Sequence, residues 1–250
     1  MKQVYIFFRR ILLSDVTGNI IRTLFRGKIW FQHLILDVSS KEIKDRIVAQ
    51  IFFQHYEREE AELVRKYLEG DRDIVELGSS TGAVATLACK HSEKKLICVE
   101  ANSKLIDVIK TNLTMNGIDK ERIFVTHGAI SDREDQGKKV WFAPRGSNEL
   151  GRISEDRQSA GMLVPTICLS RILSENNIRE YTLISDIEGA EVAFLFDDVQ
   201  SMDLCKQLFI ELHAITWKGR KHKIEDLVCR IKSLGFELVE ALNTNYYFRK

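Results

Sequence analysis

The sequence has few prolines, few cysteines and almost no net charge. Its 250 residues include 2 prolines and 5 cysteines, and the formal net charge is +1. The cysteines form no CxxC pair and their number is odd, so neither a disulfide framework nor a zinc site is expected. A free cysteine in an apolar run acts as a small hydrophobic residue. The cysteine pattern therefore predicts a reduced, cytoplasmic protein.

The near balance of charge also excludes one class of partner at this stage. Because 37 Lys and Arg residues offset 36 Asp and Glu residues, the field of the whole molecule gives no reason to expect nucleic-acid binding. We therefore predict no nucleic acid as a partner. Hydrophobic residues make up 44% of the chain, which is ordinary for a globular protein with one large core.

No apolar run is long enough to cross a bilayer, which takes ~20 apolar residues. The first segment, MKQVYIFFRRILLSDV, is apolar and basic, but Arg9 and Arg10 interrupt it and no cleavage site follows. We expect a helix packed on the main domain. A basic helix lying on a membrane surface through residues 1–26 is the alternative, and this segment is also a candidate interface for a homo-oligomer.

Strand-like and helix-like segments alternate from residue 73 onward. Apolar runs predict strands at 73–77, 95–99, 122–126, 182–186 and 207–211, with two closing strands at 236–241 and 245–249. This alternation predicts an α/β fold with parallel βαβ units in a doubly wound sheet. Ligands of such sheets bind at the carboxyl ends of the strands, so the residues that follow each strand are the candidate site.

Residues 1–70 lie outside this alternation. Residues 25–38 favour a hairpin with a bend at Gly27-Lys28, and residues 42–68 are rich in helix formers and stop before Gly70. We predict an N-terminal extension of helices and a hairpin over 1–70, followed by a Rossmann-like domain over 71–250. Residues 131–165 form a second irregular region, and a long insertion at the ligand edge is more often functional than idle.

The stretch DIVELGSSTG ends a strand in a glycine turn but lacks the GxG of dinucleotide-binding sequences. Gly78 and Gly82 are spaced as GxxxG, and Ser80 stands where the dinucleotide fingerprint has its second glycine. The loop therefore lacks the close approach that a pyrophosphate needs. Glu76, just before it, would repel phosphate and favour a cationic ligand such as the methionyl part of S-adenosylmethionine. These features argue against a nicotinamide-dependent oxidoreductase, the first alternative function.

The next two strand ends suggest a nucleoside site. The second strand ends at Glu100, about 20 residues beyond the glycine loop, where a ribose-binding acid is expected. A carboxylate there can accept hydrogen bonds from both ribose hydroxyls. The third strand is followed by Gly128 and Ala129, small residues that would let an adenine ring lie flat.

Three carboxylates follow the fourth strand, in the stretch SDIEGAE. Asp186 and Glu188 alternate as residues on one face of a strand do, and either could take the proton from an acceptor hydroxyl. Glu191 is expected in the first turn of the next helix, where the helix dipole favours a carboxylate. His213, after the fifth strand, is the third candidate base because its ordinary pKa suits proton transfer at neutral pH. A purely structural strand-end histidine is an equal interpretation.

A metal site is an alternative for the same strand ends. Asp186, Glu188, Glu211 and His213 would converge there, and such an oxygen-rich set suits magnesium or manganese more than zinc. A metal would lower the pKa of the acceptor hydroxyl. Ligands from two strands cannot be read from local spacing, so a divalent metal is not favoured and we predict no metal ligands.

Five segments occur in one order over residues 50–215: HYEREE, VELGSSTG, VEANSKLIDVIKTNLTMNG, SDIEGAE and FIELH. In this order they resemble the FkbM-type S-adenosylmethionine-dependent methyltransferases. The resemblance implies a class I methyltransferase fold, with a seven-stranded sheet whose last strand is antiparallel. It implies S-adenosyl-L-methionine as cofactor and methyl transfer, usually to oxygen, on a sugar, polysaccharide precursor or natural product. The expected partner is thus a small-molecule or glycan substrate. A non-catalytic binding relative of the same fold is the remaining alternative.

The resemblance also implies site residues, which lie in the glycine loop, at three strand ends and just before the domain. The expected cofactor contacts are Tyr56, Glu76, Gly78, Ser79, Ser80, Thr81, Gly82, Glu100, Ala101, Asn102, Gly128, Ala129 and Asp186, and the expected catalytic residues are Asp186, Glu188 and His213. The acid of the first strand is often Asp in that family and is Glu here. By position alone, Trp141, Arg145, Asn148 and Arg152 are candidates for acceptor contacts.

Overall fold

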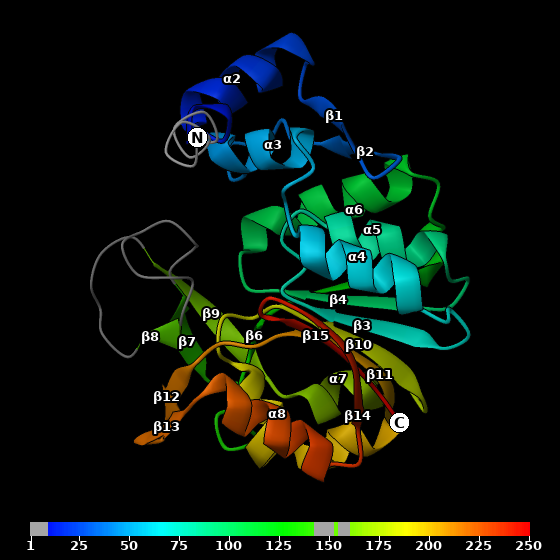
Figure 1. Cartoon of the computed structure of the whole chain (residues 1–250), viewed down its shortest axis with the longest axis vertical. Helices are drawn as coiled ribbons and strands as arrows, with labels where there is room; N and C mark the ends of the chain where they lie inside the picture. The colour runs from blue at the N-terminus through cyan, green and yellow to red at the C-terminus, as the bar shows by residue number, and fades with distance from the viewer. Residues whose placement is uncertain (1–9, 143–152, 155–160) are drawn as a thin grey trace.

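The computed structural model describes residues 10–142, 153–154 and 161–250 (Figure 1). Its centre is a seven-stranded sheet with the strand order β14-β15-β11-β10-β3-β4-β5. The strands are β3 (Asp73–Leu77), β4 (Leu96–Glu100), β5 (Ile123–His127), β10 (Tyr181–Ser185), β11 (Cys205–Glu211), β14 (Glu237–Leu242) and β15 (Asn245–Arg249). Each predicted strand of the sheet is therefore present, within a few residues of its expected bounds.

The pairing directions confirm the predicted fold class. β5, β4, β3, β10 and β11 are parallel to their neighbours, whereas β15 is antiparallel to both β11 and β14. The sheet is thus the seven-stranded, Rossmann-like sheet of a class I methyltransferase fold, with its last strand antiparallel.

Helices cover both faces of this sheet (Figure 1). One face carries α4 (Arg58–Tyr67), α5 (Ala83–Lys90) and α6 (Ile106–Met115), and the other carries α7 (Leu169–Glu175) and α8 (Ile224–Ser233). Side chains of β3 alternate between the two layers, with Ile74 packed in the first and Val75 in the second. Because both faces are buried in this way, the edge at the carboxyl ends of the strands is left for a ligand.

The part that precedes the sheet forms an apolar cluster of its own. It holds α2 (Asp15–Leu24), the hairpin β1 (Lys28–Phe31) and β2 (Leu34–Asp37), and α3 (Asp45–Phe52). The hairpin was expected, and so was a bend at Gly27-Lys28, where the turn 25–27 leads from α2 into β1. The two-residue turn between the strands lies at Gln32 and His33, both at positive φ. Primed turns of this kind match the twist of paired strands, which explains why the bend lies midway between them.

The helix-rich stretch 42–68 is broken in two. It is interrupted between α3 and α4, where Gln54 and Glu57 adopt φ values of 58° and 41°. α4 then contributes Leu63 and Val64 to the core between this helical layer and the sheet. The division of the chain at residue 70 stays a prediction.

Two smaller sheets stand at the carboxyl edge of the main one (Figure 1). The strands β6 (Ala129–Ile130), β9 (Met162–Ile167), β7 (Lys139–Phe142) and β8 (Ile153–Ser154) pair in this order, and β12 (Ile215–Trp217) pairs with β13 (Arg220–His222). Region 131–165, expected as irregular, therefore contains strands, and the hairpin β12–β13 was not expected. The remaining elements are short: η1 (Ser103–Leu105), η2 (Lys120–Arg122), the π-helix η3 (Ala193–Asp197) and η4 (Val199–Leu204).

The amino-terminal segment is only partly described. Residues 1–9 lie outside the described part, so the helix expected from residue 1 is not tested over them. α2 leaves Val16 and Leu24 largely exposed and buries Ile21. Over the described ranges, none of the helices is both long and apolar enough to cross a membrane.

Candidate functional site

A cavity of about 1350 Å³ lies at the carboxyl ends of the central strands. Three parts of the chain form its walls. The main sheet supplies the ends of β3, β4 and β10, the amino-terminal part supplies residues 41–47, and the edge sheets supply residues of β7, β12 and β13. The place agrees with the rule that doubly wound sheets bind ligands beyond the carboxyl ends of their strands.

Most of the residues expected in the site line this cavity. Those that do are Tyr56, Gly78, Ser80, Thr81, Glu100, Ala101, Asn102, Gly128, Ala129, Asp186 and Glu188. Glu76, Ser79, Gly82 and His213 are not among the lining residues. Trp141 is a lining residue, whereas Arg145, Asn148 and Arg152 fall outside the described residues. The roles of all these residues remain predictions.

The packing of neighbouring strand ends requires a glycine at position 78. Gly78 has a φ of 85°, and a Cβ placed on it would lie 2.0 Å from the carbonyl oxygen of Asp186. Its N–H donates to the carbonyl of Val99 at 2.9 Å. Only glycine therefore lets the ends of β3 and β10 come together beside β4. Gly78 was expected as a cofactor contact, and the nearest neighbour of a Cβ placed on it is the chain's own backbone at Asp186.

Glu100 is fixed at the floor of the cavity by backbone donors. Its Oε2 accepts a hydrogen bond from the N–H of Ser80 at 2.8 Å, and its Oε1 accepts one from the N–H of Asn102 at 2.7 Å. Burial raises the pKa of Glu100, and these two backbone donors oppose the rise. Each oxygen keeps a second lone pair, so the group can still accept hydrogen bonds from a ligand.

Glu76 lies behind the loop rather than in the cavity. It is 3% exposed, and the Cys98 thiol donates to its Oε2 at 3.7 Å. Burial raises the pKa of Glu76 to about 7. The sequence suggested a direct contact between Glu76 and a cationic ligand. In this position Glu76 does not reach the cavity. A carboxyl group held below the loop acts on a ligand only through its charge.

Tyr56 ties the segment before α4 to the glycine loop. Its hydroxyl donates to Ser80 Oγ at 2.9 Å. Burial raises the pKa of Tyr56 well above its ordinary value, so the hydroxyl keeps its proton and remains a donor. The predicted association of this segment with the loop is therefore present, and Tyr56 and Ser80 form one wall of the cavity.

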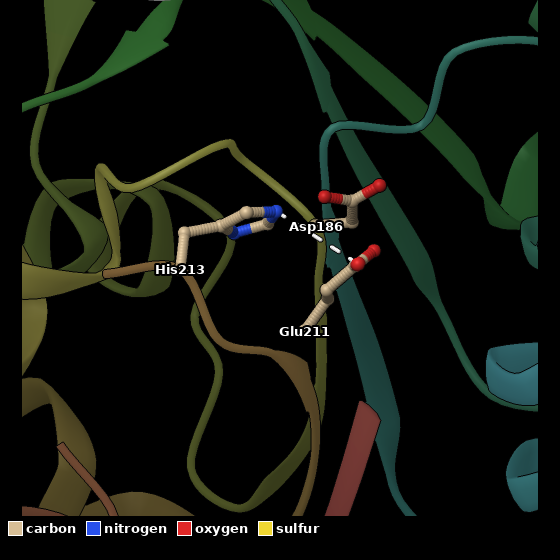
Figure 2. Close-up of side chains that lie close together, drawn as sticks. All are labelled: Asp186, Glu211 and His213. Carbon is tan, nitrogen blue, oxygen red and sulfur yellow. Dashed lines mark ion pairs between the residues drawn. The ribbon is translucent and has the colours of Figure 1, made fainter. Parts of the chain in front are cut away.

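At the other end of the cavity, Asp186 and Glu188 line the wall, and His213 with two further carboxylates lies next to them outside the lining. Figure 2 shows Asp186, Glu211 and His213 pointing toward one another from the ends of β10 and β11. His213 Nε2 lies 3.4 Å from Glu188 Oε2 and 3.8 Å from Glu211 Oε1. Its Nδ1 lies 3.3 Å from Oε1 of Glu191. Four acids from two neighbouring strand ends thus surround a single imidazole.

The backbone after β10 differs from the predicted one. β10 ends at Ser185, and Glu188 has a φ of 56°, so Asp186 and Glu188 do not share the face of a strand. Glu191 does stand at the start of a helical segment, because residues 191–192 are α-helical and lead into the π-helix η3. Glu191 is fully buried, and its Oε1 accepts from the N–H of Ile187 at 3.4 Å. Its contact with His213 is a second partner for this acid, beside its predicted place at the start of a helix.

The surroundings of His213 argue against its predicted role as a general base. Burial would lower the pKa of His213, but the carboxylates of Glu191, Glu188 and Asp186 outweigh it and raise the pKa to about 9. Among these carboxylates the imidazole holds a proton at neutral pH and cannot accept another one. Asp186 and Glu188, which line the cavity, remain the candidate bases.

Two walls of the cavity were missed by the sequence analysis. One is residues 41–47 of the amino-terminal part, and the other is the hairpin β12–β13 with Ile215 and Trp217. The hairpin does have a sequence signal, since the strand-like run ITW is followed by Lys218-Gly219. The hairpin in turn requires a glycine at position 189, because a Cβ there would meet Ile215 Cδ1 at 2.5 Å.

Comparisons with known proteins agree only at the level of the fold. No family model and no curated protein matches this chain. A solved structure from Streptococcus agalactiae, described as a protein of the NADB-Rossmann superfamily, has 13% identity and a TM-score of 0.44, covering 76% of this chain and 65% of its own. The chain thus spans slightly less than two thirds of that protein.

Two further solved structures are described as methyltransferases. One from Pyrococcus horikoshii, described as an RNA methyltransferase, has 16% identity and a TM-score of 0.43, with 79% of this chain and 82% of that one covered. One from Streptococcus pneumoniae, described as a tRNA (m1A22) methyltransferase in complex with S-adenosyl-L-methionine, has 14% identity and a TM-score of 0.42, with 76% and 69% covered.

These findings contradict the exclusion of nucleic acid as a partner. Two of the similar structures are described as RNA or tRNA methyltransferases. The exclusion rested on the net charge of the whole chain, which averages over the surface and does not describe the residues around one cavity. The prediction is therefore withdrawn.

Proposed function

We propose that this chain is an S-adenosyl-L-methionine-dependent O-methyltransferase of the FkbM type, acting on a hydroxyl of a sugar, polysaccharide precursor or natural product. The observation that carries the proposal is the position of Glu100. Its carboxylate lies at the cavity floor, fixed by the N–H groups of Ser80 and Asn102. This is the strand end at which nucleotide-binding sheets place a ribose-binding acid.

The lining residues fit the parts of this cofactor in order. The ribose hydroxyls would donate to Glu100, and the adenine would lie beside Gly128 and Ala129. The methionine part would run past the wall formed by Tyr56 and Ser80. When bound, S-adenosyl-L-methionine supplies an electrophilic methyl group on a positively charged sulfur, and acids at the strand ends favour that charge.

Asp186 and Glu188 are placed to handle the acceptor's proton. Both line the cavity, at the strand end where the proposed cofactor and acceptor would meet. A sugar hydroxyl is a poor nucleophile, so a base must take its proton as the new carbon–oxygen bond forms. The fixed geometry of the strand ends would also align acceptor oxygen, methyl group and leaving sulfur, and positioning supplies much of the rate in such displacements.

A nicotinamide-dependent oxidoreductase is the competing function for this architecture. Ser80 occupies the place of the second fingerprint glycine and has a φ of 46°. Its hydroxyl accepts a hydrogen bond from Tyr56, so a polar side chain stands where a glycine would leave the backbone open to a pyrophosphate. The loop therefore favours a cofactor without a pyrophosphate.

Calorimetric titration of the purified chain with S-adenosyl-L-methionine and with NAD tests this choice. We expect saturable binding of the first and none of the second. NAD binding without S-adenosyl-L-methionine binding would refute the proposal. A second assay with methyl-labelled cofactor and a panel of nucleotide sugars, glycans and RNA would identify the acceptor. Binding without transfer to any acceptor would favour the non-catalytic relative.

A further inference from the structure

The cluster around His213 has the composition and spacing of a metal site. One ligand atom each from Asp186, Glu211 and His213 lies within 4.8 Å of the other two. Figure 2 shows the three side chains converging on a common space between the ends of β10 and β11. Small side-chain rotations would bring such atoms to the distances of about 2.0–2.6 Å at which oxygen ligands bind divalent cations.

A second observation concerns the far side of the imidazole. His213 Nδ1 lies 3.3 Å from Glu191 Oε1, and Glu191 is fully buried. Histidines that bind metals usually donate their other ring N–H to a carboxylate, which fixes the tautomer and the ring orientation. The contact with Glu191 thus turns Nε2 toward the acids that face it. The second oxygen of Glu191, Oε2, is buried and has no hydrogen-bond partner among the described residues.

The carboxylates of this cluster are either held by a hydrogen bond or exposed to the cavity. Thr244 Oγ1 donates to Glu211 Oε1 at 2.9 Å. Asp186 and Glu188 line the cavity, which gives an ion a path from solvent. Glu188 Oε2, 3.4 Å from His213 Nε2, is in reach as a fourth ligand.

We propose that Asp186, Glu211 and His213 form a binding site for one hard divalent cation of the Mn²⁺ class. Two carboxylates with one imidazole suit manganese better than zinc, which prefers nitrogen and sulfur ligands. The inference rests on the proposed function for its role, because the ion would lie beside the acceptor. There it would bind the acceptor oxygen and lower the pKa of its hydroxyl. The ion would replace the proton on His213 Nε2 and balance the charge of the same carboxylates.

The site can be tested without any methyl transfer. The full chain is freed of metal with a chelator, dialysed and titrated with Mn²⁺ while the free-ion signal is followed by electron paramagnetic resonance. We expect one bound Mn²⁺ per chain, and pulsed measurements should show coupling to an imidazole nitrogen. Absence of binding at millimolar Mn²⁺, or bound ion without nitrogen coupling, would overturn the proposal. So would binding of Zn²⁺ alone.

Variants then locate the ion. Glu211→Gln and His213→Gln should each weaken Mn²⁺ binding by more than ten-fold, and Glu191→Gln, which changes only the group behind the imidazole, by about 10–100-fold. Matched controls are Glu237→Gln and His91→Gln, the same changes at exposed positions, which should bind as the parent does. Wild-type affinity in Glu211→Gln and His213→Gln would place the ion elsewhere.

A calorimetric titration with S-adenosyl-L-methionine in chelator separates the two proposals. Cofactor binding without Mn²⁺ binding would reject the metal site and leave the proposed function standing. Mn²⁺ binding without cofactor binding would support the metal site and reject the proposed function. Retained cofactor affinity in His213→Gln also shows that the variant is folded.

Discussion

The two ends of the cavity hold their acids in different ways. At the glycine loop, Glu100 is bonded to backbone N–H groups of Ser80 and Asn102, which follow strands β3 and β4 directly. At the other end, Glu188, Glu191 and Glu211 meet through the side chain of His213. The two arrangements suit different tasks. The backbone end gives a rigid cradle for a cofactor, and the side-chain end gives charges that can rearrange around an acceptor.

The largest effect should come from the side-chain end. Asp186→Asn removes a candidate base, and general-base catalysis contributes about 10²–10⁴-fold, so methyl transfer at saturating cofactor should fall by that factor. Single-turnover transfer of a labelled methyl group measures it. Asp203→Asn, at an exposed position, is the control. An unchanged rate in Asp186→Asn would show that this acid serves the structure only.

A change in the backbone end should damage stability rather than chemistry. Gly78→Ala places a Cβ 2.0 Å from the Asp186 carbonyl oxygen at a φ of 85°, so we expect the free energy of unfolding to fall by about 2–4 kcal/mol. Gly117→Ala is the matched control, because Gly117 has a φ of 80° and no atom within 4 Å of the added Cβ. Urea denaturation should show a loss of only about 1 kcal/mol there. Equal losses in both variants would deny the close approach of β3 and β10.

The buried acid under the loop should make stability depend on pH. Burial raises the pKa of Glu76 from 4.5 to about 7, so between these values the folded chain binds more protons than the unfolded one. The free energy of unfolding should therefore decrease as pH rises from 4.5 to 7, by about 2–3 kcal/mol. Urea denaturation across this range measures the slope for the parent and for Glu76→Gln.

The same slope in Glu76→Gln as in the parent would mean that Glu76 is not the group responsible. Glu121→Gln, an exposed residue in η2, should keep the slope of the parent.

The smallest expected effect concerns cofactor affinity. Glu100→Ala removes the acceptor of the ribose hydroxyls, and hydrogen bonds of this kind are worth about 1–3 kcal/mol. Calorimetry should show the corresponding weaker binding, whereas Glu237→Ala should bind as the parent does. Full affinity in Glu100→Ala would remove this residue from the cofactor site.

The backbone end could be predicted from the sequence because its parts are local. A strand, a glycine turn and the acid that ends the next strand place Gly78, Ser80 and Glu100 at one edge through a regular pattern. The side-chain end could not be predicted in the same way. Glu188 adopts a positive φ that no pattern requires, and Glu191 reaches His213 across 22 residues of sequence.

For the fold as well, local features could be predicted from the sequence and long-range packing could not. The seven strands have clear apolar runs, and their alternation with helices predicts parallel pairing. The walls contributed by residues 41–47 and by β12–β13 depend on how distant segments pack over the edge, which periodicity does not reveal. The contact of Ile215 with Gly189 is another that joins distant segments at this edge.

The most direct test is a crystal structure of the chain soaked with S-adenosyl-L-methionine. The account predicts the ribose hydroxyls on the Glu100 carboxylate, the adenine beside Ala129 and the methyl group directed toward Asp186 and Glu188. A cofactor bound away from these strand ends, or crystals that take up none at saturating concentration, would contradict it.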